Sequence, residues 1–180
     1  MTQKKGTAAY ILRLTLTLFL ISAVVAGLLA LVNHVTAATI AEKTAQKAES
    51  AMRQVLVADR YEPMVIPEGS AVTAAFRADD KGYVVRVAPN GFGGAIDMMV
   101  GVGTDGAVTG VAIVNQSETA SLGANCTRED FREQFIGATG GLAVSKDGGT
   151  IDALTGATVT SRAVTEGVNT ALEFVQEVLK

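Results

Sequence analysis

The segment richest in potential chemistry is DALTGAT (residues 152–158), which stands directly before an apolar periodic run at the C-terminal end. The first turn of a helix leaves backbone N–H groups without partners, and the helix dipole places positive charge there. An anion such as a phosphate is therefore favoured at this position. The residues alone leave two interpretations open, a simple helix cap at Thr158 or an anion-binding turn. Hydroxyl groups lie in this segment and just after it, on Thr155, Thr158, Thr160 and Ser161.

The helix that would carry this turn is the clearest element of the sequence. Residues 159–180 predict an amphipathic helix, because apolar side chains recur at steps of three and four and so share one face. These side chains are Val164, Val168, Leu172, Val175 and Leu179.

Strand patterns precede this helix. Residues 82–89 alternate like a strand, and residues 95–103 and 107–115 read as two strands joined by a tight Asp-Gly turn. The same region matches G-x-G-x-x-G at Gly101, Gly103 and Gly106, but that fingerprint must open a helix, and here a strand pattern follows. We therefore interpret it as a hairpin.

Shorter elements complete the C-terminal region. Residues 127–130 resemble a helix cap, which predicts a short helix to about Phe135, ended by glycines. Residues 142–144 suggest another short strand. Because strands and helices do not alternate regularly, the predicted fold class is α+β, with a mainly antiparallel sheet flanked by helices.

The N-terminal region predicts a single transmembrane helix. Residues 14–40 contain no Lys, Arg, Asp or Glu, and the most apolar 19 residues, 14–32, would span roughly 30 Å as a helix. We place the helix from near Ala8 to near His34. The alternative is a cleaved signal peptide with its cleavage site at residues 35–37. The bias of Lys4, Lys5 and Arg13 favours a cytoplasmic N-terminus and an external C-terminal domain.

Three regions follow from these patterns. Residues 1–37 are the cytoplasmic N-terminus and membrane helix. Residues 38–69 are a stalk and linker, since residues 38–58 are Ala-rich and favour a helix, before prolines and a glycine break the chain between Tyr61 and Ser70. Residues 70–180 form a compact domain, long enough for one packed core.

Composition excludes several classes of site. With 15 Lys+Arg against 18 Asp+Glu, the formal charge is -3, which argues against a generic nucleic-acid binder. The single cysteine, Cys126, excludes an internal disulfide and a protein-held iron–sulfur cluster, and is expected to be unreactive. The single histidine, His34, excludes a His-rich metal site and a Ser-His-Asp triad in the domain. No metal site is expected, so redox chemistry would require an organic cofactor.

The segment DALTGAT resembles the flavinylation signature D-x-x-(S/T)-G-A-T of the covalent FMN-binding domain family. In that family a flavin transferase takes FMN from FAD and joins it by a phosphoester to the last threonine of the signature, which maps to Thr158. Asp152 would belong to the sequence that the transferase reads. The resemblance extends to residues 90–97, 117–124, 131–137 and 158–164.

The resemblance implies a set of residues near the flavin. Glu118 would hydrogen-bond the flavin or hydroxyl groups, or be a solvated loop charge. Leu122 would pack on the ring or in the core. The family's Pro-Gly in this loop is Ala120-Ser121 here, which puts the loop backbone in question. The implied cofactor-binding residues are Thr158, Thr155, Gly156, Ala157, Thr160, Glu118, Thr119, Leu122 and Gly123.

Over its whole length the chain resembles G subunits of Rnf-type ion-translocating complexes. That resemblance implies an electron carrier with covalent FMN, one subunit of a complex that couples ferredoxin:NAD+ electron transfer to Na+ or H+ transport. It would be anchored in the cytoplasmic membrane of the cell, with the lipid bilayer, other subunits and a flavin transferase as partners and no nucleic acid. Two alternatives stay open, an exported module that binds a phosphate-bearing ligand, and the FMN subunit of another membrane reductase such as sodium-translocating NADH:quinone reductase.

Overall fold

The structure is a computed structural model that describes residues 3–178 of the chain, so the last two residues of the predicted C-terminal helix lie outside it. The chain divides into two compact units, Met1–Ala45 and Gln46–Lys180. The domain boundary that the sequence suggests between Tyr61 and Ser70 stays a prediction.

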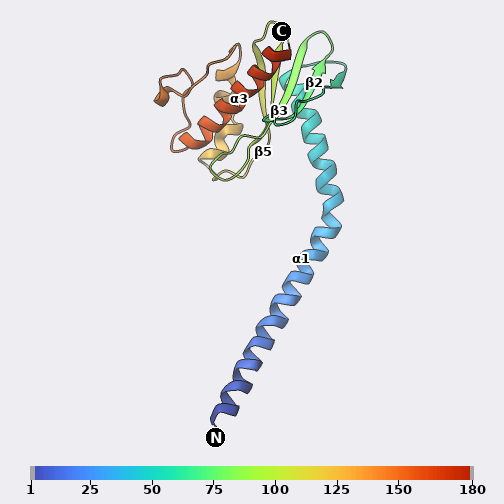
Figure 1. Cartoon of the computed structure of the whole chain (residues 1–180), viewed down its shortest axis with the longest axis vertical. Helices are drawn as coiled ribbons and strands as arrows, with labels where there is room; N and C mark the ends of the chain where they lie inside the picture. Colours follow the sequence, from blue (N-terminus) through green and yellow to red (C-terminus); the bar gives the residue numbers. More distant parts are fainter. Residues whose placement is uncertain (1–2, 179–180) are drawn as a thin grey trace. The chain divides into compact units, whose positions relative to one another are not determined.

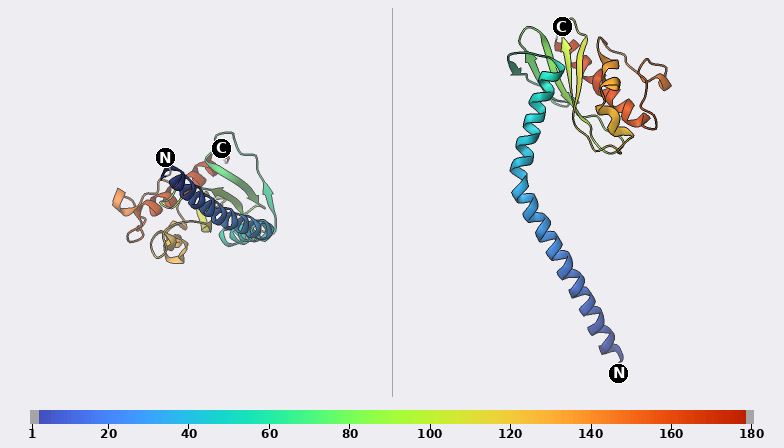
Figure 2. Two further views of the ribbon diagram at one scale, coloured as in Figure 1. Left: turned by 90° about the horizontal axis from the view of Figure 1, so that it is seen from below. Right: turned by 180° about the vertical axis from the view of Figure 1, so that it is seen from behind.

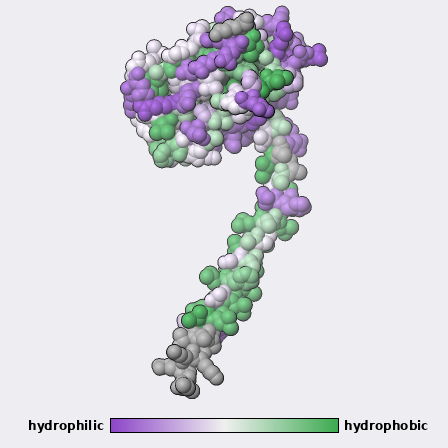
Figure 3. All heavy atoms as spheres, viewed as in Figure 1, coloured by the Kyte–Doolittle hydropathy of each residue, from purple (hydrophilic) through white to green (hydrophobic). Residues whose placement is uncertain are grey.

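The first unit is formed by helix α1 (Gln3–Val55), which continues into the second unit. Its segment Tyr10–Ala37 has a mean hydropathy of 2.5 and is long and apolar enough to cross a membrane. Most of the large side chains that this segment exposes are apolar (Figure 3). The hydroxyls of Thr17 and Thr36 donate to the carbonyls of Arg13 and Val32, one turn earlier, so these hydroxyls are satisfied within the helix.

The second unit contains a five-stranded antiparallel sheet in chain order, which confirms the predicted α+β class (Figure 1). The predicted hairpin is present, so the apparent dinucleotide fingerprint is indeed a strand–turn–strand. The sequence did not identify the first two strands. The strands are β1 (Tyr61–Pro63), β2 (Val72–Ala78), β3 (Gly82–Val87), β4 (Asp97–Gly103) and β5 (Val108–Asn115).

Both faces of the sheet are covered, because alternate side chains of each strand point to opposite faces. On one face Val85, Met98 and Val100 pack with apolar side chains of helix α3 (Thr158–Val178). Figure 2 shows this helix beside the sheet. On the other face Val84 and Met99 pack in a second cluster with Ala51, Val55 and Ala58. Strands buried on both faces explain why β4 reads as a continuous apolar run.

The last turn of α1 approaches the sheet closely at two paired glycines. Gly101 of β4 lies opposite Gly110 of β5, and a Cβ added at Gly101 would lie 2.5 Å from the carbonyl oxygen of Val55. The Thr109 hydroxyl donates to that same carbonyl at 2.6 Å, which satisfies an acceptor at the helix end.

The short helix predicted between the sheet and α3 is present, with a different N-cap. The predicted helix to Phe135 is present as α2 (Glu129–Arg132) followed by a single 3₁₀ turn, η2 (Glu133–Phe135). Its N-cap is Arg128, however, and the Thr127 hydroxyl instead donates to the Ala124 carbonyl in the preceding turn, η1 (Gly123–Thr127).

The prediction of a short strand at residues 142–144 is wrong. Only Val144 pairs, in an isolated parallel bridge to Ile151, because the chain turns at once into η3 (Ser145–Asp147).

Candidate functional site

The DALTGAT segment forms a tight turn that ends where α3 begins, at Thr158. The Ala157 N–H donates to the Leu154 carbonyl at 3.0 Å, and Gly156 adopts φ +73°, which a side chain would disfavour. The buried Ser161 hydroxyl accepts from the Leu154 N–H and donates to the Ala157 carbonyl, each at 2.9 Å. The turn is therefore held in place by the helix that it opens.

The start of the segment is held by a separate element. The Asp152 N–H donates to the side-chain carbonyl of Gln134, in η2, at 2.6 Å. This contact leaves the Asp152 side chain exposed.

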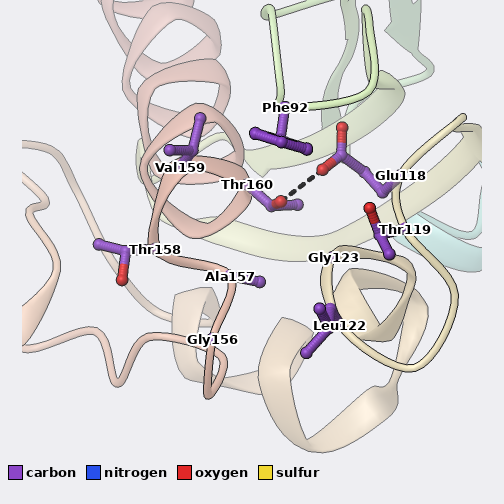
Figure 4. Close-up of a pocket in the computed structure, with 10 residues that line it drawn as sticks. All are labelled: Phe92, Glu118, Thr119, Leu122, Gly123, Gly156, Ala157, Thr158, Val159 and Thr160. Atoms are coloured by element: carbon purple, nitrogen blue, oxygen red, sulfur yellow. Dashed lines mark hydrogen bonds between the residues drawn. The ribbon is translucent and has the colours of Figure 1, made fainter.

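A pocket of about 370 Å³ opens between the turn and two loops that are distant in sequence (Figure 4). Its walls come from the loop before β4, the loop after β5 and the first turn of α3. Eight of the nine sequence-predicted site residues line it, and Phe92 and Val159 complete the lining. The eight are Glu118, Thr119, Leu122, Gly123, Gly156, Ala157, Thr158 and Thr160.

The remaining predicted residue, Thr155, lies elsewhere. It is exposed and lines a separate hollow of about 420 Å³, together with Asp152, Gln134 and Arg128. Leu122 lines both hollows, so it forms the wall between them.

Glu118 is a buried carboxylate at the back of the pocket, and both of its oxygens have partners. Oε1 accepts from the Gly93 N–H at 2.8 Å, and Oε2 accepts from the Thr160 hydroxyl at 2.5 Å. The carboxylate therefore ties the loop before β4 to the first turn of α3, across 42 residues of sequence. Of the alternatives for Glu118, the solvated loop charge is excluded, because the side chain is buried and accepts a hydrogen bond from a hydroxyl group.

Gly123 makes this arrangement possible. A Cβ at Gly123 would lie 2.6 Å from both Glu118 Oε2 and Thr160 Oγ1. A larger residue there would separate the two partners.

The mouth of the pocket carries apolar side chains that are exposed to solvent. Phe92 is 74% exposed, and Leu122 and Val159 are 41% and 49% exposed. Leu122 is therefore not a core residue, and its packing against a flavin ring stays a prediction. Phe92 and Val159 were missed by the sequence analysis, although an aromatic residue between glycines was a signal for a residue at a binding surface.

Thr158 lies at the edge of the pocket with a cation beside it. Its hydroxyl accepts a hydrogen bond from the Lys146 ammonium, of η3, at 3.0 Å. Within the described residues this is the one hydrogen bond that the Thr158 hydroxyl makes, so it does not act as a cap for the backbone of the first turn. No local pattern in the sequence pointed to Lys146.

The departure from the family pattern at Ala120-Ser121 leaves the turn intact. The Leu122 N–H donates to the Thr119 carbonyl at 3.2 Å, and Ser121 adopts φ +62°. Pro-Gly favours such a turn because glycine accepts a positive φ at its third position. Here a serine adopts that conformation, and Thr119, Leu122 and Gly123 still line the pocket.

The polar groups near the site do not form a metal centre. No group of three or more His, Cys, Asp or Glu residues that could hold a metal ion occurs within residues 3–178. Cys126 is fully buried, and burial, together with the nearby charge of Glu118, raises the pKa of its thiol to about 11. A thiol in this environment is a poor nucleophile.

Comparisons with known proteins agree with this geometry. Residues 91–173 match the family described as FMN-binding domain, and residues 1–55 match the family described as RnfG N-terminal region. The C subunit of the Na+-translocating NADH-quinone reductase from Parabacteroides distasonis has a similar fold, with a TM-score of 0.58 at 19% identity over 77% of this chain and 93% of that one.

Curated relatives match over nearly the whole chain. The G subunit of the ion-translocating oxidoreductase complex of Methanosarcina acetivorans is 33% identical over 92% of this chain and 94% of its own. The G subunit of the Na+-translocating ferredoxin:NAD+ oxidoreductase complex of Acetobacterium woodii is 33% identical, covering 94% of each chain. The proton-translocating counterpart of Clostridium ljungdahlii is 38% identical over 90% of this chain and 88% of its own. This chain belongs to the family of G subunits of Rnf-type ion-translocating oxidoreductase complexes.

Proposed function

We propose that the chain is an electron-transfer subunit that carries FMN as a phosphoester on Thr158. The observation that carries this proposal is the position of Thr158 at the edge of a pocket within the region that matches the FMN-binding domain family. The hydroxyl is half-buried and accepts a hydrogen bond from a single cation, so it is available for bond formation on its other side.

The residues present fit the two parts of such a cofactor. A flat aromatic ring suits the apolar side chains of Phe92, Leu122 and Val159 at the mouth of the pocket. A phosphate suits Thr158, where the N–H groups of the first turn of α3 and the Lys146 ammonium supply positive charge. Glu118 holds the back wall in place through Gly93 and Thr160 rather than offering a free oxygen.

When bound, FMN supplies the ability to accept and release electrons, which no side chain of the pocket has. The chain supplies position. The phosphoester occupies only the phosphate end of the cofactor, and the exposed apolar mouth leaves the ring side open to a neighbouring redox centre. We do not expect turnover by this subunit alone.

The test is to express the full chain with its flavin transferase and to examine the denatured polypeptide for fluorescence and for a mass gain of FMN less water. Thr158→Ala should lose both signals, whereas Thr158→Ser, which keeps a hydroxyl, should retain them. Thr150→Ala is the matched control, because Thr150 is an exposed threonine of the preceding loop. A colourless wild-type polypeptide would refute the proposal and favour the alternative of a module that binds a phosphate ligand noncovalently.

We also propose that α1 anchors the chain in the cytoplasmic membrane, with the N-terminus in the cytoplasm and the flavin domain outside. The support is the apolar segment Tyr10–Ala37, with Lys4 and Lys5 before it and Arg13 in its first turn. The chain offers a direct test of orientation, since its single cysteine is buried and gives little background. Val65→Cys places a thiol at a 94% exposed position.

A membrane-impermeant maleimide should label Val65→Cys in intact spheroplasts, and should label a cysteine added at the N-terminus only after lysis. The reverse pattern would overturn the orientation. Cleavage of the N-terminal residues in the mature protein would instead support a signal peptide.

The partners that we propose are the other membrane and peripheral subunits of an Rnf-type complex. The names of the relatives support ferredoxin and NAD+ as the complex's electron donor and acceptor, with Na+ or H+ as the transported ion. Purification of the tagged chain in mild detergent should recover several other membrane subunits together with ferredoxin:NAD+ activity. Recovery with a quinone reductase instead would favour the sodium-translocating NADH:quinone reductase. The similarity of fold is the support for that alternative.

A further inference from the structure

Lys146 lies beside Thr158, although twelve residues of sequence separate them. Its Nζ is 3.0 Å from Thr158 Oγ1, and it lies outside the set of residues that line the pocket. We infer that Lys146 binds the phosphate during flavin attachment, so that its ammonium holds the negatively charged group against Thr158. The inference rests on the proposed function, because it concerns the same phosphoester.

The loop that carries Lys146 is closed by its own hydrogen bonds. The Ser145 N–H donates to the Ile151 carbonyl at 2.7 Å, and the Ile151 N–H donates to the Ala143 carbonyl at 3.1 Å. Gly148 ends η3 with φ +84°, and at Gly149 any side chain would overlap the Ala143 carbonyl. The chain therefore has a defined course on both sides of Lys146.

A second contact fixes the loop against α3. Asp147 pairs with Arg162 through two hydrogen bonds of 2.6 Å, one turn along the helix from Thr158. The Arg162 guanidinium holds the pKa of Asp147 below its ordinary value, so the pair stays charged at neutral pH. Two adjacent loop residues thus bond to two helix residues on the same side of α3, which directs Lys146 toward Thr158.

The two cations of this contact have different roles. Arg162 is paired with the Asp147 carboxylate, whereas Lys146 forms no salt bridge within the described residues, although its charge also contributes to lowering the pKa of Asp147. Its ammonium is therefore available to a phosphate, which a lysine binds as a point charge.

Attachment is a phosphoryl transfer from FAD. The Thr158 oxygen forms a bond to the phosphorus of the FMN half, the bond from that phosphorus to the bridging pyrophosphate oxygen breaks, and AMP leaves with the electron pair, while the hydroxyl proton passes to water. Negative charge on the phosphoryl oxygens must be stabilised next to Thr158 during this step, and a fixed cation does so. The phosphodiester that forms keeps one negative charge beside Lys146.

The experiment measures the initial rate of flavin incorporation into the full chain in detergent, with purified flavin transferase and FAD. Lys146→Met should lower this rate about tenfold or more, and Lys146→Arg should restore most of it, since the charge returns. Added salt should slow the wild type more than Lys146→Met, because screening acts on the charge that the variant lacks. Lys47→Met, which removes an exposed lysine of α1, is the matched control and should match the wild type.

The outcomes separate the two proposals. If the wild type acquires flavin and Lys146→Met does so at the same rate, the inference about Lys146 is wrong while the proposed function stands. If the wild type acquires none, both fail. A slow Lys146→Met that Lys146→Arg does not restore, or one whose unfolding temperature falls with its rate, shows a merely structural lysine and also overturns the inference.

Discussion

The Thr160 hydroxyl donates to Glu118 Oε2 at 2.5 Å, and both side chains are buried at the back of the pocket. The other carboxylate oxygen accepts the Gly93 N–H. One side chain therefore connects three segments that the sequence separates, and it does so where the pocket wall would otherwise have two unpaired donors. Through these two contacts it holds the loop before β4 against the first turn of α3.

Replacement of Glu118 should separate its charge from its hydrogen bonds. Glu118→Ala leaves the Gly93 N–H and the Thr160 hydroxyl without partners, and should lower the free energy of unfolding by about 1–3 kcal/mol. Glu118→Gln should cost less, because its amide oxygen can accept from Gly93 and its amide nitrogen can donate to the hydroxyl oxygen. Urea unfolding of both variants in detergent checks this. Equal losses for the two variants would mean that the charge matters rather than the hydrogen bonds.

In the turn at Ala120-Ser121 we expect one substitution to stabilise the protein. Ser121 adopts φ +62°, which costs energy for any residue with a side chain. Ser121→Gly should therefore raise the free energy of unfolding by about 0.5–1 kcal/mol, after the loss of backbone entropy is included. Ala120→Gly is the matched control, since Ala120 has no positive φ and the change should only destabilise. Thermal unfolding of the two variants should shift in opposite directions, and a fall for both would contradict the prediction.

How far the sequence predicted this structure depends on how local each signal was. The helix from residue 158 and the β4–β5 hairpin were predicted because apolar periodicity and an Asp-Gly turn are local. Strand β2 was missed because VTAAFRA is rich in alanine, which has low strand propensity, and β1 is only three residues long. The partner of the Thr158 hydroxyl was missed because Lys146 reaches it only through the course of a separate loop.

At the paired glycines of β4 and β5 we expect that an added side chain would collide with the end of α1. In Gly101→Ala the new methyl group would lie 2.5 Å from the Val55 carbonyl oxygen, and both are backbone-constrained positions. The end of α1 must then move from the sheet, which should cost about 1–3 kcal/mol. Thr109→Ala tests the same contact without a clash, because it removes the hydroxyl that donates to Val55, and should cost about 1 kcal/mol. If Gly101→Ala unfolds at the same urea concentration as the wild type, the close approach of α1 to the sheet is not required for stability.

The raised pKa of Cys126 leads us to expect that the reactivity of its thiol and the stability of the fold depend on pH. Burial, with a smaller contribution from the charge of Glu118, raises the pKa of its thiol from 9.0 to about 11. At pH 8 the native thiolate fraction should thus be about 100-fold below that of the unfolded chain, because two pKa units separate the states. Because the unfolded chain loses this proton at a lower pH than the folded chain, the free energy of unfolding falls as the pH rises from 9 to about 11. Below pH 9 the contribution of the thiol to stability is fully present. Labelling with a thiol reagent at pH 8 should therefore be slow in the native chain and fast in urea. In Cys126→Ser the decline of stability between pH 9 and 11 should be smaller, and an identical decline would show that another group causes it.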